Sequence, residues 1–182
     1  MRPRQSGLLE TFCRIGVRPD SVQVLGGTLS FGLPTRVRVG PTSYEGVYLE
    51  RRRGAGFGLY NAVGIKRDDM DGRVAQMLEN FRFFGAPHVA VISSPMQLGT
   101  YGAVDCGVFV STLLAAAQSL GMSTIAQAAV AMYADFVHEF LNIPRDRNIV
   151  CAVSFGFEDP HHRAKGFHTE RAGLDDVVTH LG

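Results

Sequence analysis

Residues 80–87, with the sequence NFRFFGAP, constrain the fold of this 182-residue chain more than any other feature. The aromatic run predicts the end of a helix. Gly85 and Pro87 favour a sharp turn after it, because glycine tolerates the left-handed conformation that closes a helix and proline lacks an N–H donor. The sequence HVAVIS follows at once. Its β-branched, apolar run at 89–93 is typical of a buried strand. The segment therefore predicts a helix that turns directly into the core of a sheet.

Hydrophobic periodicity predicts the other elements. Residues Val74, Met77, Leu78 and Phe81 recur at helical spacing, which indicates a helix over 68–83 with one apolar face. An almost wholly apolar helix is expected over 103–120 after a loop at 95–102, and another over 126–141. A second β-rich segment is expected at 148–155, and a short helix or strand at 174–178. Strands that alternate with longer helices indicate an α+β or α/β architecture.

The N-terminal part has a different character. Residues 1–43 contain four prolines and a glycine pair, and no helix-length apolar period occurs there. The short runs SVQVL and TRVRV are β-prone. We therefore expect residues 1–43 to be an atypical, poorly packed segment and residues 44–182 to form the domain.

Three further segments complete an ordered pattern with NFRFFGAP: DCGVFVSTLLAAAQSLGMST, HEFLNIPRDRNIVCAVSFGFEDP and FHTER at 167–171. Together they resemble the C-terminal two-thirds of the flavin-dependent nitroreductase family, especially its nitrobenzoate-type branch, from about residue 44 to 181. The resemblance implies an α+β fold with helices around a central, mostly antiparallel sheet. It also implies a homodimer that holds FMN between its subunits.

The sequence departs from that family in two places. Residues 1–40 contain neither the Arg-Ser-x-Arg phosphate motif nor the Pro-Ser-x-x-Asn-x-Gln-Pro-Trp motif, and the chain has no Trp. This predicts truncation or a shifted reading frame upstream of about residue 41, and impaired FMN binding. In addition, Ala126 stands where many relatives have Pro, and Val130 where many have Trp.

The resemblance also implies the site residues. Arg171 would grip the FMN phosphate, because a guanidinium binds phosphate oxygens through a planar fork, and His168 would supply a second donor. In the segment STIAQAA, the residues Ala126, Gln127 and Ala128 would present backbone donors to the flavin. The alternatives are a solvated tail at 168–171 and an ordinary helix N-terminus at 126–128. A flavin enzyme needs no catalytic triad, so no catalytic side chain is assigned.

Composition restricts the partners. The formal net charge of +1 gives no electrostatic argument for nucleic acid or an anionic membrane. The N-terminus lacks the apolar stretch of a signal peptide, so we expect a cytoplasmic protein.

Cys106 and Cys151 lie in apolar segments and are interpreted as small buried hydrophobes. No metal site is predicted, since the spacing of a polar cluster near residue 160 matches none that is familiar; its members are Glu158, Asp159, His161 and His162.

These observations lead to one main hypothesis and two alternatives. The main hypothesis is an FMN-dependent oxidoreductase that takes hydride from NADH or NADPH in ping-pong order and reduces a small-molecule acceptor, either a nitroaromatic, a quinone or a similar compound. The first alternative is a non-catalytic dimerisation domain that binds flavin weakly or not at all. The second is a dehalogenase or reductase of the same superfamily with another substrate.

Overall fold

The computed structural model describes residues 22–25 and 43–181 of the chain. They form two compact units. Unit 1 contains the described residues 22–25 and 77–158, and unit 2 contains residues 43–76 and 159–181. The strand expected at TRVRV and the poor packing expected of most of residues 1–43 lie outside the described residues.

Unit 1 is built on an antiparallel sheet. Its strands are β1 (Val22–Leu25), β2 (His88–Pro95), β3 (Ser123–Gln127) and β4 (Arg147–Gly156), arranged in the order β1-β2-β4-β3. Every pair of neighbours in this sheet is antiparallel. The strands predicted at 89–93 and 148–155 are confirmed as the central pair, and the predicted α+β class with a mostly antiparallel sheet is confirmed with them.

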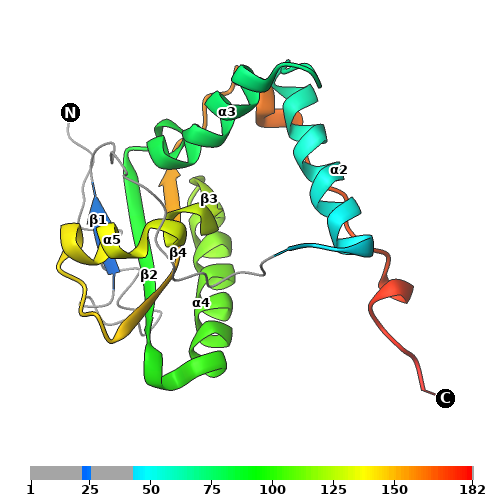
Figure 1. The fold of residues 1–182 in the computed structure, drawn as a ribbon. Helices are drawn as coiled ribbons and strands as arrows, with labels where there is room; N and C mark the ends of the chain where they lie inside the picture. Colours follow the sequence, from blue (N-terminus) through cyan, green and yellow to red (C-terminus); the bar gives the residue numbers. More distant parts are fainter. Residues whose placement is uncertain (1–21, 26–42, 182) are drawn as a thin grey trace. The chain divides into compact units, whose positions relative to one another are not determined.

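Helices cover both faces of the central pair. Helix α4 (Gly99–Ser119) lies on one side of β2 and β4, and α5 (Ala134–Leu141) lies on the other (Figure 1). Since side chains alternate along a strand, β2 serves two cores. Val89 and Val91 pack with α5, while Ala90 and Ile92 pack with α4. The core of unit 1 is therefore two apolar layers separated by one sheet.

Strand β4 carries a β-bulge at Val150. Ile92 of β2 pairs with Cys151, but the next residue, Ser93, pairs with Ile149, so Val150 has no partner across the ladder. A bulge adds one residue and interrupts the alternation of faces. As a result Val150 and Cys151 both pack against the α4 layer, whereas Ile149 belongs to the α5 layer.

Helix α4 is long and apolar but mostly uncovered in the single chain. Its buried residues are Gly102, Cys106, Leu113 and Ala117. With the preceding turn it forms the one stretch of the described residues, Met96–Ser119, that is long and apolar enough to cross a membrane, a test that core helices of soluble proteins also pass. The helix predicted over 103–120 is confirmed, but it begins at Gly99, inside the expected loop.

Two helix predictions were wrong in their bounds. The helix expected over 68–83 is α3 (Met70–Leu78), and it is followed by the 3-10 helix η2 (Glu79–Gly85). Phe83 and Phe84 interrupt the helical geometry with φ values of 54° and 53°. The reason is packing, because Phe83 is 1% exposed and a continuing helix would carry its ring away from the core.

The helix expected over 126–141 was wrong at its start. Residues 123–127 form strand β3, residues 128–133 form the 3-10 helix η4 (Ala128–Tyr133), and only α5 is an α-helix. Alanine favours helix, but pairing with β4 overrides that weak preference.

Unit 2 consists of α2 (Gly46–Ala62), most of α3, and two short 3-10 helices, η5 (Arg163–Gly166) and η6 (Leu174–Asp176). None of its described residues is buried. The Phe167 ring packs against Gly58 of α2, where an added Cβ would lie 2.7 Å from the ring. The short element expected at 174–178 is η6.

Candidate functional site

Strand β3 places the first group of predicted site residues at one end of the described sheet. Ala126 pairs with Val153 and Gln127 with Ala152 of β4. Within the described residues the opposite edge of β3 has no neighbouring strand. An edge strand leaves alternate backbone N–H groups unpaired, so this edge offers donors to a ligand or to another chain. These donors come from a strand, not from the helix N-terminus that the sequence suggested.

Residues 126–128 alternate sharply in exposure. Ala126 and Ala128 are exposed, whereas Gln127 is 2% exposed. Gln127 is extended, with φ −129° and ψ 104°, and residues directly opposite in an antiparallel pair share a face of the sheet. Its side chain therefore lies on the face of Ala152, in the α5 layer. Only the two small alanine side chains face outward, which allows a flat ring to approach the backbone closely.

The Gln127 side chain reaches back to the aromatic turn. Its Nε2 donates to the backbone oxygen of Asn80 at 2.6 Å. Its Oε1 is the one buried side-chain oxygen or nitrogen of the described residues with no hydrogen-bond partner. The side-chain amide of Gln127 therefore joins β3 to η2 inside the protein and is not exposed to bind a cofactor.

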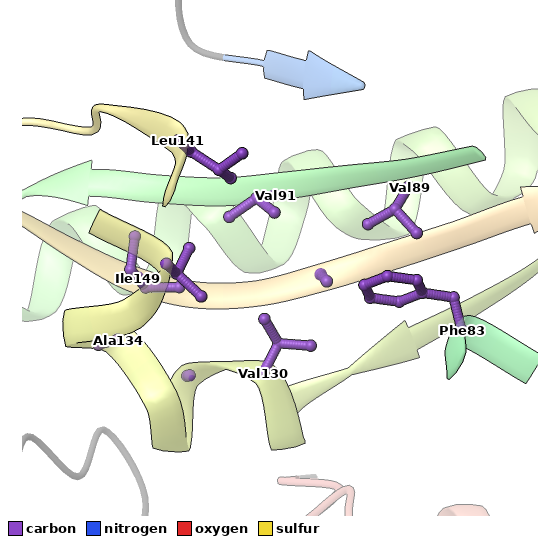
Figure 2. Packing of buried hydrophobic residues seen from close by; sticks show 10 residues of the cluster. Phe83, Val89, Val91, Val130, Ala134, Leu141 and Ile149 are labelled. Atoms are coloured by element: carbon purple, nitrogen blue, oxygen red, sulfur yellow. The ribbon is translucent and has the colours of Figure 1, made fainter. Parts of the chain in front are cut away.

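The η2 turn is strained and well anchored. Phe83, Phe84 and Gly85 all have positive φ, and the left-handed conformation costs a non-glycine residue about 1–2 kcal/mol. Figure 2 shows Phe83 pointing into the α5 layer together with Val89 and Val130. Phe81 also packs edge-to-face on Tyr133, with ring centroids 5.1 Å apart. Burial of aromatic surface offsets the strain and fixes this turn beside η4.

Sequence reasoning missed the role of this turn. The motif NFRFFGAP was recognised, but the left-handed pair of phenylalanines was not expected, since only Gly85 signals a positive φ in sequence. The bond between Asn80 and Gln127 spans 47 residues, and no local pattern announces such a contact.

The second group of predicted site residues, His168 and Arg171, lies in unit 2, and both side chains are exposed. Arg171 donates from one terminal nitrogen to the backbone oxygens of Thr169 at 3.1 Å and Glu170 at 3.3 Å, and to the Thr169 hydroxyl. The ion pairs found among the described residues do not include it. The structure thus groups residues 126–128 in unit 1 and residues 168 and 171 in unit 2, each within its own unit.

The polar cluster near residue 160 serves local turns. Asp159 accepts a hydrogen bond from the backbone N–H of His161 at 2.9 Å, and His162 Nδ1 accepts one from that of Ala164 at 3.2 Å. Among the described residues, no group of three or more histidine, cysteine or acidic side chains is arranged to hold a metal ion.

The described cysteines lie in an apolar environment. Both are free, and both pack in the α4 layer. Burial raises the pKa of the Cys106 thiol, against the field of Arg147. Burial, and then the neighbouring Cys106, raises the pKa of Cys151 to about 11. The thiolate is the reactive form, and burial disfavours it here. Cys106 is buried as predicted, whereas Cys151 is partly buried against the same layer.

The layered sheet, with α4 on one face and the exposed alanines at its end, defines the class: an α+β protein of the nitroreductase fold. The Nitroreductase family matches residues 42–157 of the sequence. The chain belongs to this family.

Relatives agree with this assignment. The sequence is 37% identical over 143 residues to a 4-nitrobenzoate reductase of Nocardioides sp. (strain LMS-CY), covering 78% of this chain and 58% of the relative. It is 36% identical to Nitroreductase NfnB of Mycolicibacterium smegmatis (strain ATCC 700084 / mc(2)155), covering 74% of this chain and 57% of the relative. The chain thus spans less than two-thirds of the length of these curated relatives.

Solved structures share the fold. The structure is similar to the FMN-dependent nitroreductase NfnB from Mycobacterium smegmatis in complex with NADPH, with 30% identity and a TM-score of 0.75, over 88% of this chain and 78% of that one. It is also similar to the FMN- and NADPH-dependent NfnB of a Sphigopyxis strain, HMH, with 25% identity and a TM-score of 0.85, over 100% of this chain and 92% of that one.

Proposed function

We propose that this chain is an FMN-dependent oxidoreductase that takes hydride from NADPH and reduces a nitroaromatic compound of the nitrobenzoate kind. The observation that carries the proposal is the match of residues 42–157 to the Nitroreductase family, together with relatives named for 4-nitrobenzoate. Ping-pong order, and activity toward quinones, are part of the proposal.

The residues present fit the cofactor. Arg171 is exposed and has no carboxylate partner within the described residues, so its guanidinium is free to turn from its own segment to a phosphate. The open edge of β3 offers backbone N–H groups beside two exposed alanines. When bound, FMN supplies the hydride and electron chemistry.

In this scheme the chain binds and orients rather than performing acid–base chemistry. Within unit 1, the backbone of Ala126 and Ala128 would hold the polar edge of the ring; within unit 2, Arg171 and His168 would hold a phosphate. Gln127 lies between these two alanines in the sequence, and its buried side chain bonds to the Asn80 oxygen instead of contacting the cofactor. The N-terminal phosphate motif is absent from residues 1–40, so we expect weaker FMN binding than in a relative that has it.

We also propose that the protein is a cytoplasmic homodimer, with residues 44–182 as its domain. Tyr101, Val104 and Val108 form an apolar stripe on α4 and are 81%, 55% and 64% exposed. A stable interface needs such a surface, and a second copy of α4 has matching chemistry. For the location, the free cysteines Cys106 and Cys151 are in keeping with a reducing compartment.

Light scattering tests the dimer. The Val108→Asp variant should show monomers, while the parent protein shows dimers. A parent protein that is monomeric at micromolar concentration would contradict the dimer.

The decisive experiment on function is flavin binding followed by turnover. Purified protein should acquire flavin absorption bands on addition of FMN, and should then oxidise NADPH in the presence of 4-nitrobenzoate. Arg171→Ala should weaken FMN binding by about 1.5–3 kcal/mol, the range for a hydrogen bond to a charged group. Arg53→Ala, also an exposed arginine of unit 2, is the matched control and should bind normally. A parent protein that takes up no FMN would support the non-catalytic alternative instead.

A further inference from the structure

A buried side chain of unit 1 contains a polar atom that the fold leaves unpaired. Gln127 is 2% exposed, and its Oε1 has no hydrogen-bond partner among the described residues. A buried acceptor without a donor is unfavourable, and methionine, of similar length, would avoid it. The feature that distinguishes glutamine from methionine here is therefore the other half of the amide, whose Nε2 donates to the Asn80 oxygen at 2.6 Å.

That bond is one of several contacts between η2 and residues 127–133. Phe81 packs on Tyr133, and Phe83 shares the α5 layer with Val130 (Figure 2). The aromatic contacts hold η4, whereas the amide bond is the contact that acts on the last residue of β3. Together these contacts fix the backbone on both sides of Ala128, at Gln127 before it and in η4 after it.

The gripped segment is the one that carries the exposed alanines. Ala126 and Ala128 flank Gln127, and Gln127 is extended, so their backbone N–H groups point the same way. A bond that fixes Gln127 thereby fixes the peptide group that follows it. We propose that Gln127 is a positioning residue: its side-chain amide holds the end of β3 against η2, and so sets the direction of the Ala128 N–H group toward a bound flavin. The flavin part of this inference rests on the proposed function.

Hydrogen exchange tests the positioning without any flavin. In flavin-free protein, Gln127→Met should accelerate amide exchange of a peptide covering residues 123–133 by about tenfold, the effect of losing one hydrogen bond. Peptides from β2 should be unaffected. The control is Gln97→Met, because Gln97 is exposed on the 3-10 helix η3 (Met96–Leu98) of the same unit, and it should exchange like the parent protein.

A second variant separates positioning from simple packing. Gln127→Glu keeps the shape of the side chain, but an ionised carboxylate cannot donate to the Asn80 oxygen, whereas the protonated acid can. Burial disfavours the charged form and raises the pKa of the introduced carboxyl. The nearest charges on η2, Glu79 and Arg82, pair with each other at 3.2 Å. No residue of η4 is acidic or basic, and Arg147 of β4 is bonded to Ser93. In α5, the buried His138 bonds through Nδ1 to the Ile143 oxygen at 3.0 Å, Asp135 pairs with Arg145, and Glu139 is exposed.

The expected result is a pH profile found in one variant. After correction for intrinsic exchange rates, Gln127→Glu should protect residues 123–133 at low pH and lose that protection as pH rises, while Gln127→Met shows no such change. Equal exchange in the parent protein and Gln127→Met would overturn the positioning role. So would a uniform loss of protection across unit 1 in both variants, since that is the signature of general destabilisation.

Flavin titration then connects the clamp to the site. If the parent protein binds FMN, Gln127→Met should raise the dissociation constant about tenfold and Gln97→Met should leave it unchanged. Normal FMN affinity in Gln127→Met would overturn the link to the flavin. If the parent protein binds no FMN, the proposed function and the flavin part of the inference both fail, while the exchange result still decides whether Gln127 positions β3.

Discussion

Units 1 and 2 are held together in different ways. Unit 1 has an apolar layer on each face of its sheet, with ten buried residues in one and six in the other. Unit 2 has no buried residue among those described, although it contains the 17-residue helix α2. Helices in proteins are stabilised mainly by packing of an apolar face. Unit 1 therefore has a core that can fix its geometry, whereas the described residues of unit 2 provide no such core.

The difference bears directly on the candidate site. Ala126, Gln127 and Ala128 belong to the unit with its own core, and Arg171 and His168 belong to the unit without one. If the proposed site binds FMN, the backbone donors of residues 126–128 would be held by a core before binding, whereas the segment of Arg171 and His168 would gain order on binding. Order acquired on binding reduces affinity by its entropic cost.

The largest expected effect comes from emptying the core of unit 1. Phe83→Ala should lower the free energy of unfolding by about 3–5 kcal/mol, the usual loss for a buried phenylalanine. Phe167→Ala, which removes the ring packed on Gly58 of unit 2, should change it by less than about 1 kcal/mol, because that ring is only half-buried. Urea unfolding of both variants provides the measurement. Equal losses would show that unit 2 has a core of its own.

The next effect concerns the thiols of the α4 layer. With the pKa of Cys151 at about 11, only about one thiol in a thousand is ionised at pH 8. In a Cys13→Ser background, iodoacetamide should modify native Cys151 about a hundredfold more slowly than the unfolded chain. Because folding raises this pKa, the free energy of unfolding should be unaffected by the thiol below about pH 9, the ordinary pKa of the unfolded chain. It should fall as pH rises from 9 toward 11, where the thiol ionises in the unfolded chain but not in the folded one. Fast labelling of the native protein would show that the α4 layer opens readily.

Alanine substitution at two glycines of α4 should change the stability in opposite directions. A Cβ at Gly102 would lie 2.1 Å from Ser94 Oγ and 3.0 Å from Leu98 Cβ, whereas one at Gly107 would meet nothing within 4 Å. Gly102→Ala should therefore destabilise the protein by about 1–3 kcal/mol. Gly107→Ala should stabilise it by about 0.5–1 kcal/mol through helix propensity. Thermal unfolding distinguishes them. A loss of stability in Gly107→Ala would indicate that the proposed dimer interface extends from Val104 and Val108 to this position.

The smallest effects are expected in α2. Gly54 has open space around its Cα, and Gly58 faces only the flexible Phe167 ring. Gly54→Ala should stabilise by about 0.5–1 kcal/mol, and Gly58→Ala by less, because the ring must shift. A strongly destabilised Gly58→Ala would contradict the loose packing of unit 2. Far-ultraviolet circular dichroism during urea unfolding gives both values.

The sequence predicted those parts of the fold that local pattern determines. Strands β2 and β4 were found because their β-branched runs have no helical period, and α4 was found because its length and apolarity exceed those of a strand. Strand β3 was missed because AQAAV favours helix locally, and its strand conformation comes from pairing with residues about 29 positions later, as at Ile125 and Ser154.

The resemblance named the candidate site residues, whose role stays a prediction, but it did not predict their geometry. Family motifs pointed to residues 126–128, yet nothing in the sequence showed that Gln127 turns inward. Its partner, the Asn80 oxygen, is a backbone atom that any residue could provide. The left-handed Phe83 and Phe84 likewise follow from burial of a ring, which depends on residues from several elements.

The bulge in β4 has a consequence for chain length. Ile92 pairs with Cys151, and the next residue, Ser93, pairs with Ile149. Val150 of β4 therefore has no partner residue on β2. Deleting Val150 would join Ile149 to Cys151 with each on its present face, and would leave a regular strand. Deleting Ala152 instead would turn every residue on one side of it to the opposite face. This strand therefore has one position at which a codon can be lost without moving the core, and it lies in the middle of the sheet rather than in a loop.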